Sequence, residues 1–208
     1  MMVHRTPFFL PWFYPSLIWR IPTNAKEIFL TFDDGPVPGP TEFVLDVLKK
    51  SEIKATFFSI GENVVMNKEI YQRIMQDGHT IGNHTFNHIK GWNHTDDEYL
   101  KNIEKCGHAL GFNAQLFRPP YGRIKKSQIP KLSQYKIIMW DVLTSDYSKS
   151  ISPERCLAGS IASTRPGSIV VFHDSLKAER NLTYALPRYI DHFLTEGYSF
   201  KCIPTLKV

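Results

Sequence analysis

Two adjacent carboxylates stand where a short hydrophobic run ends, and they could take part in hydrolytic chemistry. Residues 28–32 lead into Asp33 and Asp34, which are followed by Gly35 and Pro36. Asp, Gly and Pro are common turn residues, so a plain turn is one interpretation of this segment. In the other interpretation the two carboxylates point in different directions, and one binds a metal ion while its neighbour accepts a proton from water.

A pair of histidines further along the chain could complete a metal site. His84 and His88 are four residues apart, and a helical turn at this spacing would place both imidazoles on one side. A surface pair without a function is the alternative. With Asp34 the pair gives the two-histidine, one-carboxylate set that catalytic zinc sites use. We therefore expect one divalent metal ion on Asp34, His84 and His88, zinc first, with cobalt, nickel or manganese as alternatives.

Arg118 is a third candidate, because it stands at the end of another hydrophobic run and precedes two prolines. It could form an ordinary ion pair with a surface helix. Beside Asp33, its guanidinium would instead hold the carboxylate ionised and fix its direction.

His173 follows the apolar run 169–172 and has two interpretations. A single histidine at this position is often a buried strand-end residue. It is also the side chain best able to protonate a departing amine near neutral pH. A carboxylate should then orient it, and Asp146 and Asp141 are both candidates.

The segments that carry these residues alternate between short β-rich runs and longer amphipathic stretches. Seven strands are expected, at residues 28–32, 55–60, 80–83, 115–118, 136–142, 168–172 and 198–203. Six helices are expected between them. A capping box at 95–98 begins one helix, Ser152-Pro153 begins another, and Gly78 and Gly197 end two more.

This order predicts an α/β fold with a mainly parallel sheet, closed into a distorted, seven-stranded (β/α) barrel that is TIM-barrel-like. The chain of 208 residues is short for a full eightfold barrel. Reactive side chains in such barrels lie at the C-terminal ends of the strands. Five of the seven expected strands end at residues that could take part in catalysis or metal binding.

The composition favours one domain over residues 1–208, with 42% hydrophobic residues to form a single core. The net charge of +5 is spread along the chain, which argues against a nucleic-acid-binding protein. Three widely separated cysteines (Cys106, Cys156 and Cys202) form no metal or redox motif, and we expect them to be reduced. We also expect a monomer.

Residues 1–27 form an aromatic and proline-rich segment that we expect to pack on the barrel. Pro7, Pro11 and Pro15 interrupt any helix, and the apolar run is shorter than the ~20 residues that span a membrane. No cleavage site follows it, so we expect a cytoplasmic protein. Peripheral contact with the inner membrane surface is the alternative, through aromatic side chains of the kind that favour this interface: Phe8, Phe9, Trp12 and Phe13.

Taken in order, the segments resemble the motifs of the polysaccharide deacetylases, the carbohydrate esterase family 4 enzymes that share a NodB-type domain. The resemblance covers residues 28–208.

Residues 31–35 (Thr-Phe-Asp-Asp-Gly) are similar to the first motif, which implies Asp33 as general base and Asp34 as metal ligand. Residues 84–88 (His-Thr-Phe-Asn-His) resemble the second, which implies both histidines as ligands. Residues 118–122 (Arg-Pro-Pro-Tyr-Gly) resemble the third, which implies that Arg118 pairs with the base and that the Tyr121 backbone N–H helps to stabilise the oxyanion.

The last two motifs depart from the family pattern. Where the family has Asp-x-x-Asp-Trp, residues 143–147 read Leu-Thr-Ser-Asp-Tyr, so the first carboxylate is absent and Tyr147 replaces the tryptophan that lines the acetyl pocket. Asp146 still fits the role of orienting the histidine. The fifth motif, usually Leu-x-His, is Val-Phe-His and keeps His173. We expect Trp140 and Tyr147 to contact the substrate, together with Tyr121.

The resemblance implies a metal-dependent hydrolase of linear amide bonds. It would remove an acetyl group from an N-acetylated sugar, such as an N-acetylglucosamine-type glycan or its precursor, and release acetate and a free amine. Two alternatives stay open. One is hydrolysis of another acyl group, such as an N-formyl amide or an O-acetyl ester. The other is a carbohydrate-binding module without catalytic activity.

Overall fold

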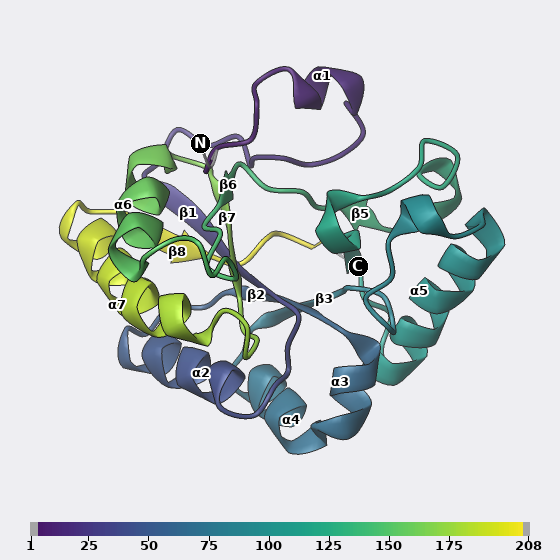
Figure 1. Cartoon of the computed structure of the whole chain (residues 1–208), viewed down its shortest axis with the longest axis horizontal. Coiled ribbons are helices and arrows are strands. Elements are labelled where there is room, and N and C mark those ends of the chain that lie inside the picture. Colours follow the sequence, from purple (N-terminus) through teal and green to yellow (C-terminus); the bar gives the residue numbers. More distant parts are fainter. Residues whose placement is uncertain (1–3, 206–208) are drawn as a thin grey trace.

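The computed structural model describes residues 4–205, and at its centre short parallel strands curl into a distorted barrel (Figure 1). The strands are β1 (Glu27–Asp33), β2 (Thr56–Ser59), β3 (Thr80–Asn83), β4 (Leu116–Phe117), β5 (Lys136–Ile137), β6 (Val142–Leu143), β7 (Ile169–His173) and β8 (Ser199–Lys201). Their order is β5-β4-β3-β2-β1-β7-β6, and β8 pairs with the first residues of β1. All these strand pairs are parallel, which confirms the predicted α/β barrel.

Helices surround this sheet and connect its strands (Figure 1). They are α1 (Leu10–Phe13), α2 (Pro40–Lys50), α3 (Gly61–Met66), α4 (Lys68–Gln76), α5 (Asp96–Leu110), α6 (Pro153–Ser163) and α7 (Glu179–Thr195). The predicted capping box begins α5, where Thr95 and Glu98 each accept a hydrogen bond from the other's backbone N–H. Ser152 caps α6 as expected.

The strand predicted at residues 136–142 is wrong in one respect, because it is divided between the two edges of the sheet. Its first part, β5, pairs with β4, and its end leads into β6, which pairs with β7. The N–H of Ile138 donates to Phe117 O at 2.8 Å, and the N–H of Asp141 donates to Ile169 O at 3.0 Å. The same segment therefore contacts both edges, and the apolar pattern of the sequence does not reveal where the partner changes.

The N-terminal segment fills the gap between these edges. The N–H of Ile18 donates to Ile137 O at 2.9 Å, and the N–H of Met139 donates to Ile18 O at 2.7 Å. Leu17 is buried beside them. Farther toward the N-terminus, α1 is a single turn with Pro11 near its start and no buried residue. Over residues 4–205, none of the helices has the length and apolar character needed to cross a membrane.

Two of the expected helices differ from the prediction. Between β4 and β5 the chain forms only two 3₁₀ turns, Pro120–Gly122 and Pro130–Leu132, and inside the first Tyr121 has a φ of 59°, which lies outside the right-handed helical region. The helix expected to end near Gly78 is broken at Asn67, whose φ of −124° separates α3 from α4.

The alternation of β1 places one of the predicted reactive residues inside the barrel. Ile28, Leu30 and Phe32 belong to the core that packs beneath the helices. Phe29 belongs to a separate cluster inside the barrel. Because successive strand residues point to opposite faces, Asp33 shares the inner face with Phe29, at the C-terminal end of the strand. The three cysteines are free thiols, as expected.

Candidate active site

A groove of about 670 Å³ lies at the C-terminal ends of the barrel strands. Eight of the predicted site residues line it: Asp33, Asp34, His84, His88, Tyr121, Trp140, Tyr147 and His173. The remaining two, Arg118 and Asp146, are buried beneath it. Residues that are distant in sequence therefore meet in one place, as the strand-end argument predicts.

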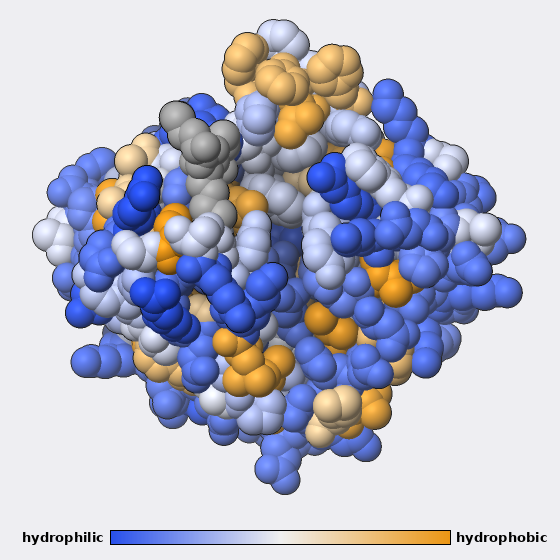
Figure 2. All heavy atoms as spheres, viewed as in Figure 1, coloured by the Kyte–Doolittle hydropathy of each residue, from blue (hydrophilic) through white to orange (hydrophobic). Residues whose placement is uncertain are grey.

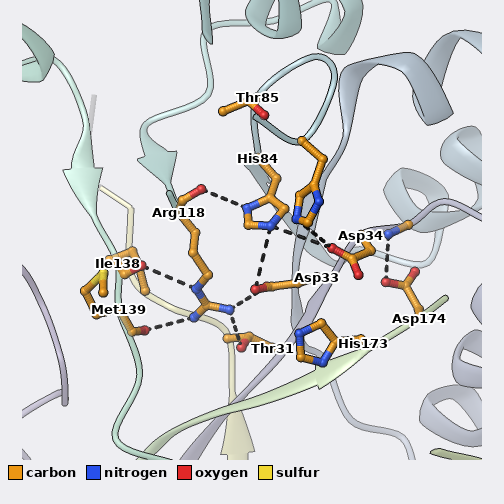
Figure 3. A network of polar contacts seen from close by, with 12 residues as sticks. Thr31, Asp33, Asp34, His84, Thr85, Arg118, Ile138, Met139, His173 and Asp174 are labelled. Carbon is orange, nitrogen blue, oxygen red and sulfur yellow. Dashed lines mark hydrogen bonds and ion pairs between the residues drawn. The ribbon is translucent and has the colours of Figure 1, made fainter. Parts of the chain in front are cut away.

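Arg118 is fully buried and holds Asp33 (Figure 3). Its guanidinium donates to Asp33 Oδ1 at 2.6 Å and to Thr31 Oγ1 at 2.8 Å. It also donates to the backbone carbonyls of Ile138 and Met139. A buried charge is tolerated only when it is paired and hydrogen-bonded, and these four acceptors meet that condition. The alternative of an ordinary surface ion pair is therefore wrong.

Asp34, His84 and His88 form a compact set of donor atoms. Asp34 Oδ1 lies 3.2 Å from His88 Nε2 and 3.8 Å from His84 Nε2. One donor atom from each residue lies within 4.8 Å of the others. Within residues 4–205, Asp34 Oδ1 is buried and forms no hydrogen bond. Two imidazoles and a carboxylate with an unsatisfied buried oxygen fit a divalent cation.

The protonation of His84 suits a metal ligand. Its Nδ1 lies 2.8 Å from the carbonyl oxygen of Arg118, which can only accept a hydrogen bond, so Nδ1 carries the hydrogen. The lone pair is then on Nε2, which faces Asp34. Burial, and next the neighbouring charge of His88, hold the pKa of His84 well below its usual value. Burial also lowers the pKa of His88.

The helical turn expected to align the two histidines is wrong, because residues 84–88 form a loop. Thr85 and His88 have positive φ values of 63° and 56°. Asn83 anchors the loop by accepting from the Thr85 N–H at 2.9 Å, and Asn102 on α5 accepts from the Phe86 N–H at 2.7 Å. The imidazoles converge because these amide side chains fix the loop.

Asp174 fixes the turn that carries the two carboxylates, and no role was predicted for it. Its Oδ1 accepts from the Gly35 N–H at 3.0 Å, and its Oδ2 accepts from Thr41 Oγ1 at 2.6 Å. Burial raises the pKa of Asp174 to about 8. A Cβ at Gly35 would lie 1.8 Å from Asp174 Oδ2, so only glycine fits there. Asp34, next to it, has a φ of 86°.

His173 lies beside Asp33 on the neighbouring strand and is held by Asp146. Its Nδ1 lies 2.7 Å from Asp146 Oδ1. Burial alone would lower the pKa of His173, but the Asp146 carboxylate, together with the charges of Asp34 and Asp33, outweighs burial and raises the pKa to about 9. Asp141 instead accepts hydrogen bonds from Arg165 and from Ser168. The structure therefore selects Asp146 from the two candidates.

Comparison with known proteins agrees with this arrangement, since the family model described as polysaccharide deacetylase matches residues 20–140. The chain belongs to the polysaccharide deacetylase family. Members of this family are generally metal-dependent, and Asp34, His84 and His88 form a candidate metal site in this member.

Two relatives show how far the likeness to other polysaccharide deacetylases extends. A peptidoglycan-N-acetylglucosamine deacetylase of Bacillus cereus is 34% identical over 192 residues, which cover 89% of this chain and 70% of the relative. A chitooligosaccharide deacetylase of Azorhizobium caulinodans is 30% identical over 203 residues, covering 89% of this chain and 96% of the relative.

Solved structures of the family share the fold. The crystal structure of the Bc1960 peptidoglycan N-acetylglucosamine deacetylase, in complex with a naphthalenyl-N-oxidanyl-benzamide, matches with a TM-score of 0.88 and 33% identity over 96% of this chain and 95% of that one. BA3943 of Bacillus anthracis, described as a CE4 family pseudoenzyme, matches with a TM-score of 0.78 and 28% identity over 91% and 68% of the two chains.

The aromatic residues expected to contact substrate in this polysaccharide deacetylase surround the polar centre. The Tyr121 ring lies 4.6 Å from the His88 ring, and the Tyr147 ring lies edge-on to His173 at 4.9 Å. Trp140 lines the same groove. Several other residues of the groove, mostly basic or aromatic, were not predicted from the sequence: Lys90, Trp92, Arg123 and Lys177. They lie within a few residues after the motif residues, but isolated basic and aromatic side chains in loops form no pattern that marks them as part of the groove.

Proposed function

We propose that this polysaccharide deacetylase hydrolyses the acetamide of an N-acetylated sugar in a glycan or glycan precursor, and releases acetate and a free amine. One observation carries the proposal. A set of metal donors, a carboxylate held by a buried arginine and a histidine held by a buried aspartate meet in one groove. The relatives named for peptidoglycan N-acetylglucosamine and for chitooligosaccharides support this substrate class.

We assign the metal site to Asp34, His84 and His88. The ligand set of two histidines and one carboxylate suits zinc best, with cobalt, nickel or manganese as alternatives. A bound divalent cation would supply Lewis acidity toward the amide carbonyl and the attacking water.

Asp33 serves as the general base in this proposal. The contact of 2.6 Å with Arg118 fixes the direction of its carboxylate. Asp33 Oδ2 lies 4.0 Å from His84 Nε2, so the carboxylate stands beside the metal donors without replacing one of them. It can therefore take the proton of the attacking water.

His173 serves as the general acid. Because Asp146 engages Nδ1, the other ring nitrogen, Nε2, is the one free to protonate the departing amine. We assign the Tyr121 backbone N–H to the negative charge that develops on the carbonyl oxygen. A preorganised donor of this kind typically lowers the barrier by about 2.7 to 4 kcal/mol.

Acetate release from N-acetylglucosamine oligomers tests the function. We expect the zinc-loaded enzyme to release acetate and the variant Asp33→Asn to lose this activity while still binding zinc. Asp97→Asn, at an exposed position on α5, is the matched control and should remain active. Acetate release by Asp33→Asn at nearly the wild-type rate would show that another group is the base.

Parallel assays separate the alternatives. Turnover of an N-formyl amide or an O-acetyl ester in preference to the N-acetyl oligomer would reassign the acyl group. Binding of the oligomer without any acetate release would favour a carbohydrate-binding module, and the pseudoenzyme BA3943 shows that this fold occurs without activity. The intact set of donors, base and acid weighs against that alternative.

We further propose that the protein acts as a monomer and that its N-terminal aromatics touch a lipid surface. Support for membrane contact comes from the exposed tip around α1, where Phe8 and Trp12 are each 76% exposed. Figure 2 shows this apolar group projecting at the top of the molecule above a mostly hydrophilic surface. The cytoplasmic location stays a prediction.

A further inference from the structure

The groove of the candidate active site has an excess of positive charge at its rim. Three exposed basic residues line it: Lys90, Arg123 and Lys177. Among the described residues, the only acidic side chains in its lining are Asp33 and Asp34, which lie at the metal donors. Within residues 4–205, none of the three basic side chains forms an ion pair. Their charges are therefore available to a ligand in the groove.

Each of the three cations lies over an aromatic ring of the groove. Lys90 Nζ lies 4.4 Å from the centre of the Tyr121 ring, and Lys177 Nζ lies 5.2 Å from that of Tyr147. Arg123 Cζ lies 4.2 Å from the Trp92 ring. Cation–π contacts hold the basic groups in place without neutralising them, because the rings carry no net charge.

The cations flank the metal donors from two sides. Lys90 follows β3 and Arg123 follows β4, which lie on one side of β1 in the sheet. Lys177 follows β7 on the other side of β1. Tyr121 contacts the ring of His88, and Tyr147 contacts that of His173, so one ring separates a cation from the polar centre on each side. A glycan lying across the groove would pass both groups.

Such an arrangement is electrostatically costly for a neutral ligand. Three unpaired cations repel one another, and they repel any divalent cation bound nearby. Negative groups on the ligand would remove this repulsion and would also speed the encounter, since complementary charge steers association.

We propose that the groove binds an anionic glycan, with carboxylate or phosphate groups on the sugars that flank the reacting N-acetylated sugar. Lys90 and Arg123 bind the anion on one side, and Lys177 binds the anion on the other. This inference rests on the proposed deacetylase function and names the charge of its substrate. It favours a glycan that carries acidic substituents over a neutral N-acetylglucosamine oligomer.

Dissociation constants measured in the Asp33→Asn background test the binding without turnover. The ligands are a neutral N-acetylglucosamine tetramer, a tetramer of the same length with lactyl carboxylates on alternate sugars, and a third with phosphate monoesters. The rim variant Arg123→Gln/Lys177→Gln removes one cation from each side. Lys49→Gln/Lys50→Gln is the matched control, because it removes the same charge from the exposed end of α2, outside the groove.

We expect an anionic tetramer to bind more tightly than the neutral one, and we expect the rim variant to reduce this preference about fivefold. The control variant should keep the preference. High salt should weaken the preference of the wild-type protein for the anionic tetramer. It should have less effect on the preference of the rim variant. Comparison of the carboxylate and phosphate ligands identifies the anion.

A neutral tetramer that binds as tightly as both anionic ones, or a preference that the rim variant retains, would overturn the proposal. Acetate release by the wild-type enzyme is measured separately with the same ligands. Absence of turnover with all of them would contradict the deacetylase function. The dissociation constants would still show whether the basic residues at the rim bind an anionic glycan. The two failures are therefore distinguishable.

Discussion

The carboxylate of Asp146 contacts both the ring and the backbone of His173. Oδ1 lies 2.7 Å from the ring Nδ1, and Oδ2 accepts from the backbone N–H at 2.7 Å. Asp146 itself is buried, and its backbone carbonyl accepts from Asn181 Nδ2 at 2.8 Å. The imidazole is therefore fixed in direction and in tautomer, with its other nitrogen left for the substrate.

We expect Asp146→Asn to lower kcat at least about tenfold, because the acid loses its orienting carboxylate. The same change removes the negative charge that raises the pKa of His173. A general acid must be protonated, so the alkaline limb of the pH profile of kcat should move to lower pH. Profiles of the wild type and of Asp97→Asn provide the comparison. An alkaline limb that stays in place would show that His173 is not the acid.

The contact between His173 and Asp146 should also make the stability of the metal-free protein depend on pH. The pKa of His173 is raised from 6.5 to about 9, so the folded state holds the proton more tightly than the unfolded state does. This contribution is fully present below the unfolded pKa and is lost as the pH rises through the folded one. The difference in unfolding free energy between wild type and Asp146→Asn should therefore be larger at pH about 6 than at pH about 9.5. Urea unfolding with a chelator present measures it, and a difference that grows with pH would contradict the pairing.

Arg118→Lys should destabilise the fold by about 3 kcal/mol or more, because breaking a buried, fully paired charge is costly. Lysine carries a single ammonium and cannot reach all four acceptors of the guanidinium at once. Arg73→Lys is a suitable control, since Arg73 pairs with Asp46 at the surface and the change should cost less than about 1 kcal/mol. Equal losses in urea unfolding would argue against the buried network.

Much of the fold and the centre of the site were accessible from sequence because strand ends and residue types carry that information. A hydrophobic run followed by Asp33, Asp34 or His173 marks both a strand and a reactive residue. The identity of the orienting carboxylate was not accessible, because Asp141 lies at the end of the strand predicted at residues 136–142 and Asp146 lies in the loop just after it, so either could reach His173. Only the tertiary structure shows that Asp141 is engaged by Arg165.

The predictions that were wrong or absent depend on contacts between distant residues, which the sequence pattern does not contain. The segment around Ile138 reads as one strand, but its hydrogen-bond partners lie at two different edges. The spacing of His84 and His88 suggested a helical turn, and instead Asn83 and Asn102 stabilise a loop. Asp174 escaped notice because its partners, Gly35 and Thr41, are more than 130 residues away.

Asp174→Ala should weaken zinc binding about tenfold, and Asp174→Asn should weaken it less. The alanine leaves the Gly35 N–H and the Thr41 hydroxyl without their acceptor, so the turn that carries Asp34 loosens. Asparagine keeps one carbonyl oxygen for Gly35. Zinc titration monitored by calorimetry measures the affinity, and circular dichroism checks that each variant folds. Equal affinities in all three proteins would show that Asp174 does not position the ligand.

Zinc should raise the melting temperature of the metal-depleted wild-type protein, because a ligand that binds only the folded state stabilises it by RT ln(1 + [L]/Kd). At about 100 times Kd this amounts to about 2.7 kcal/mol. His84→Ala and His88→Ala should lose most of the increase. His108→Ala is the control, because its imidazole is exposed on α5 and lies outside the donor set. A full increase in either ligand variant would place the cation elsewhere.

Replacement of the four exposed aromatics at the N-terminal tip by serine should abolish most binding to lipid vesicles. The residues are Phe8, Phe9, Trp12 and Phe13. They stack edge to face with one another, and α1 buries none of its residues, so their apolar surface is available to a bilayer interface. Co-sedimentation with vesicles of phosphatidylcholine and phosphatidylglycerol should show a loss of about tenfold or more. Phe112→Ser removes an exposed ring at the end of α5 and should bind like the wild type. Unchanged binding by the tip variant, with unchanged deacetylation of a soluble oligomer, would remove the basis for membrane contact.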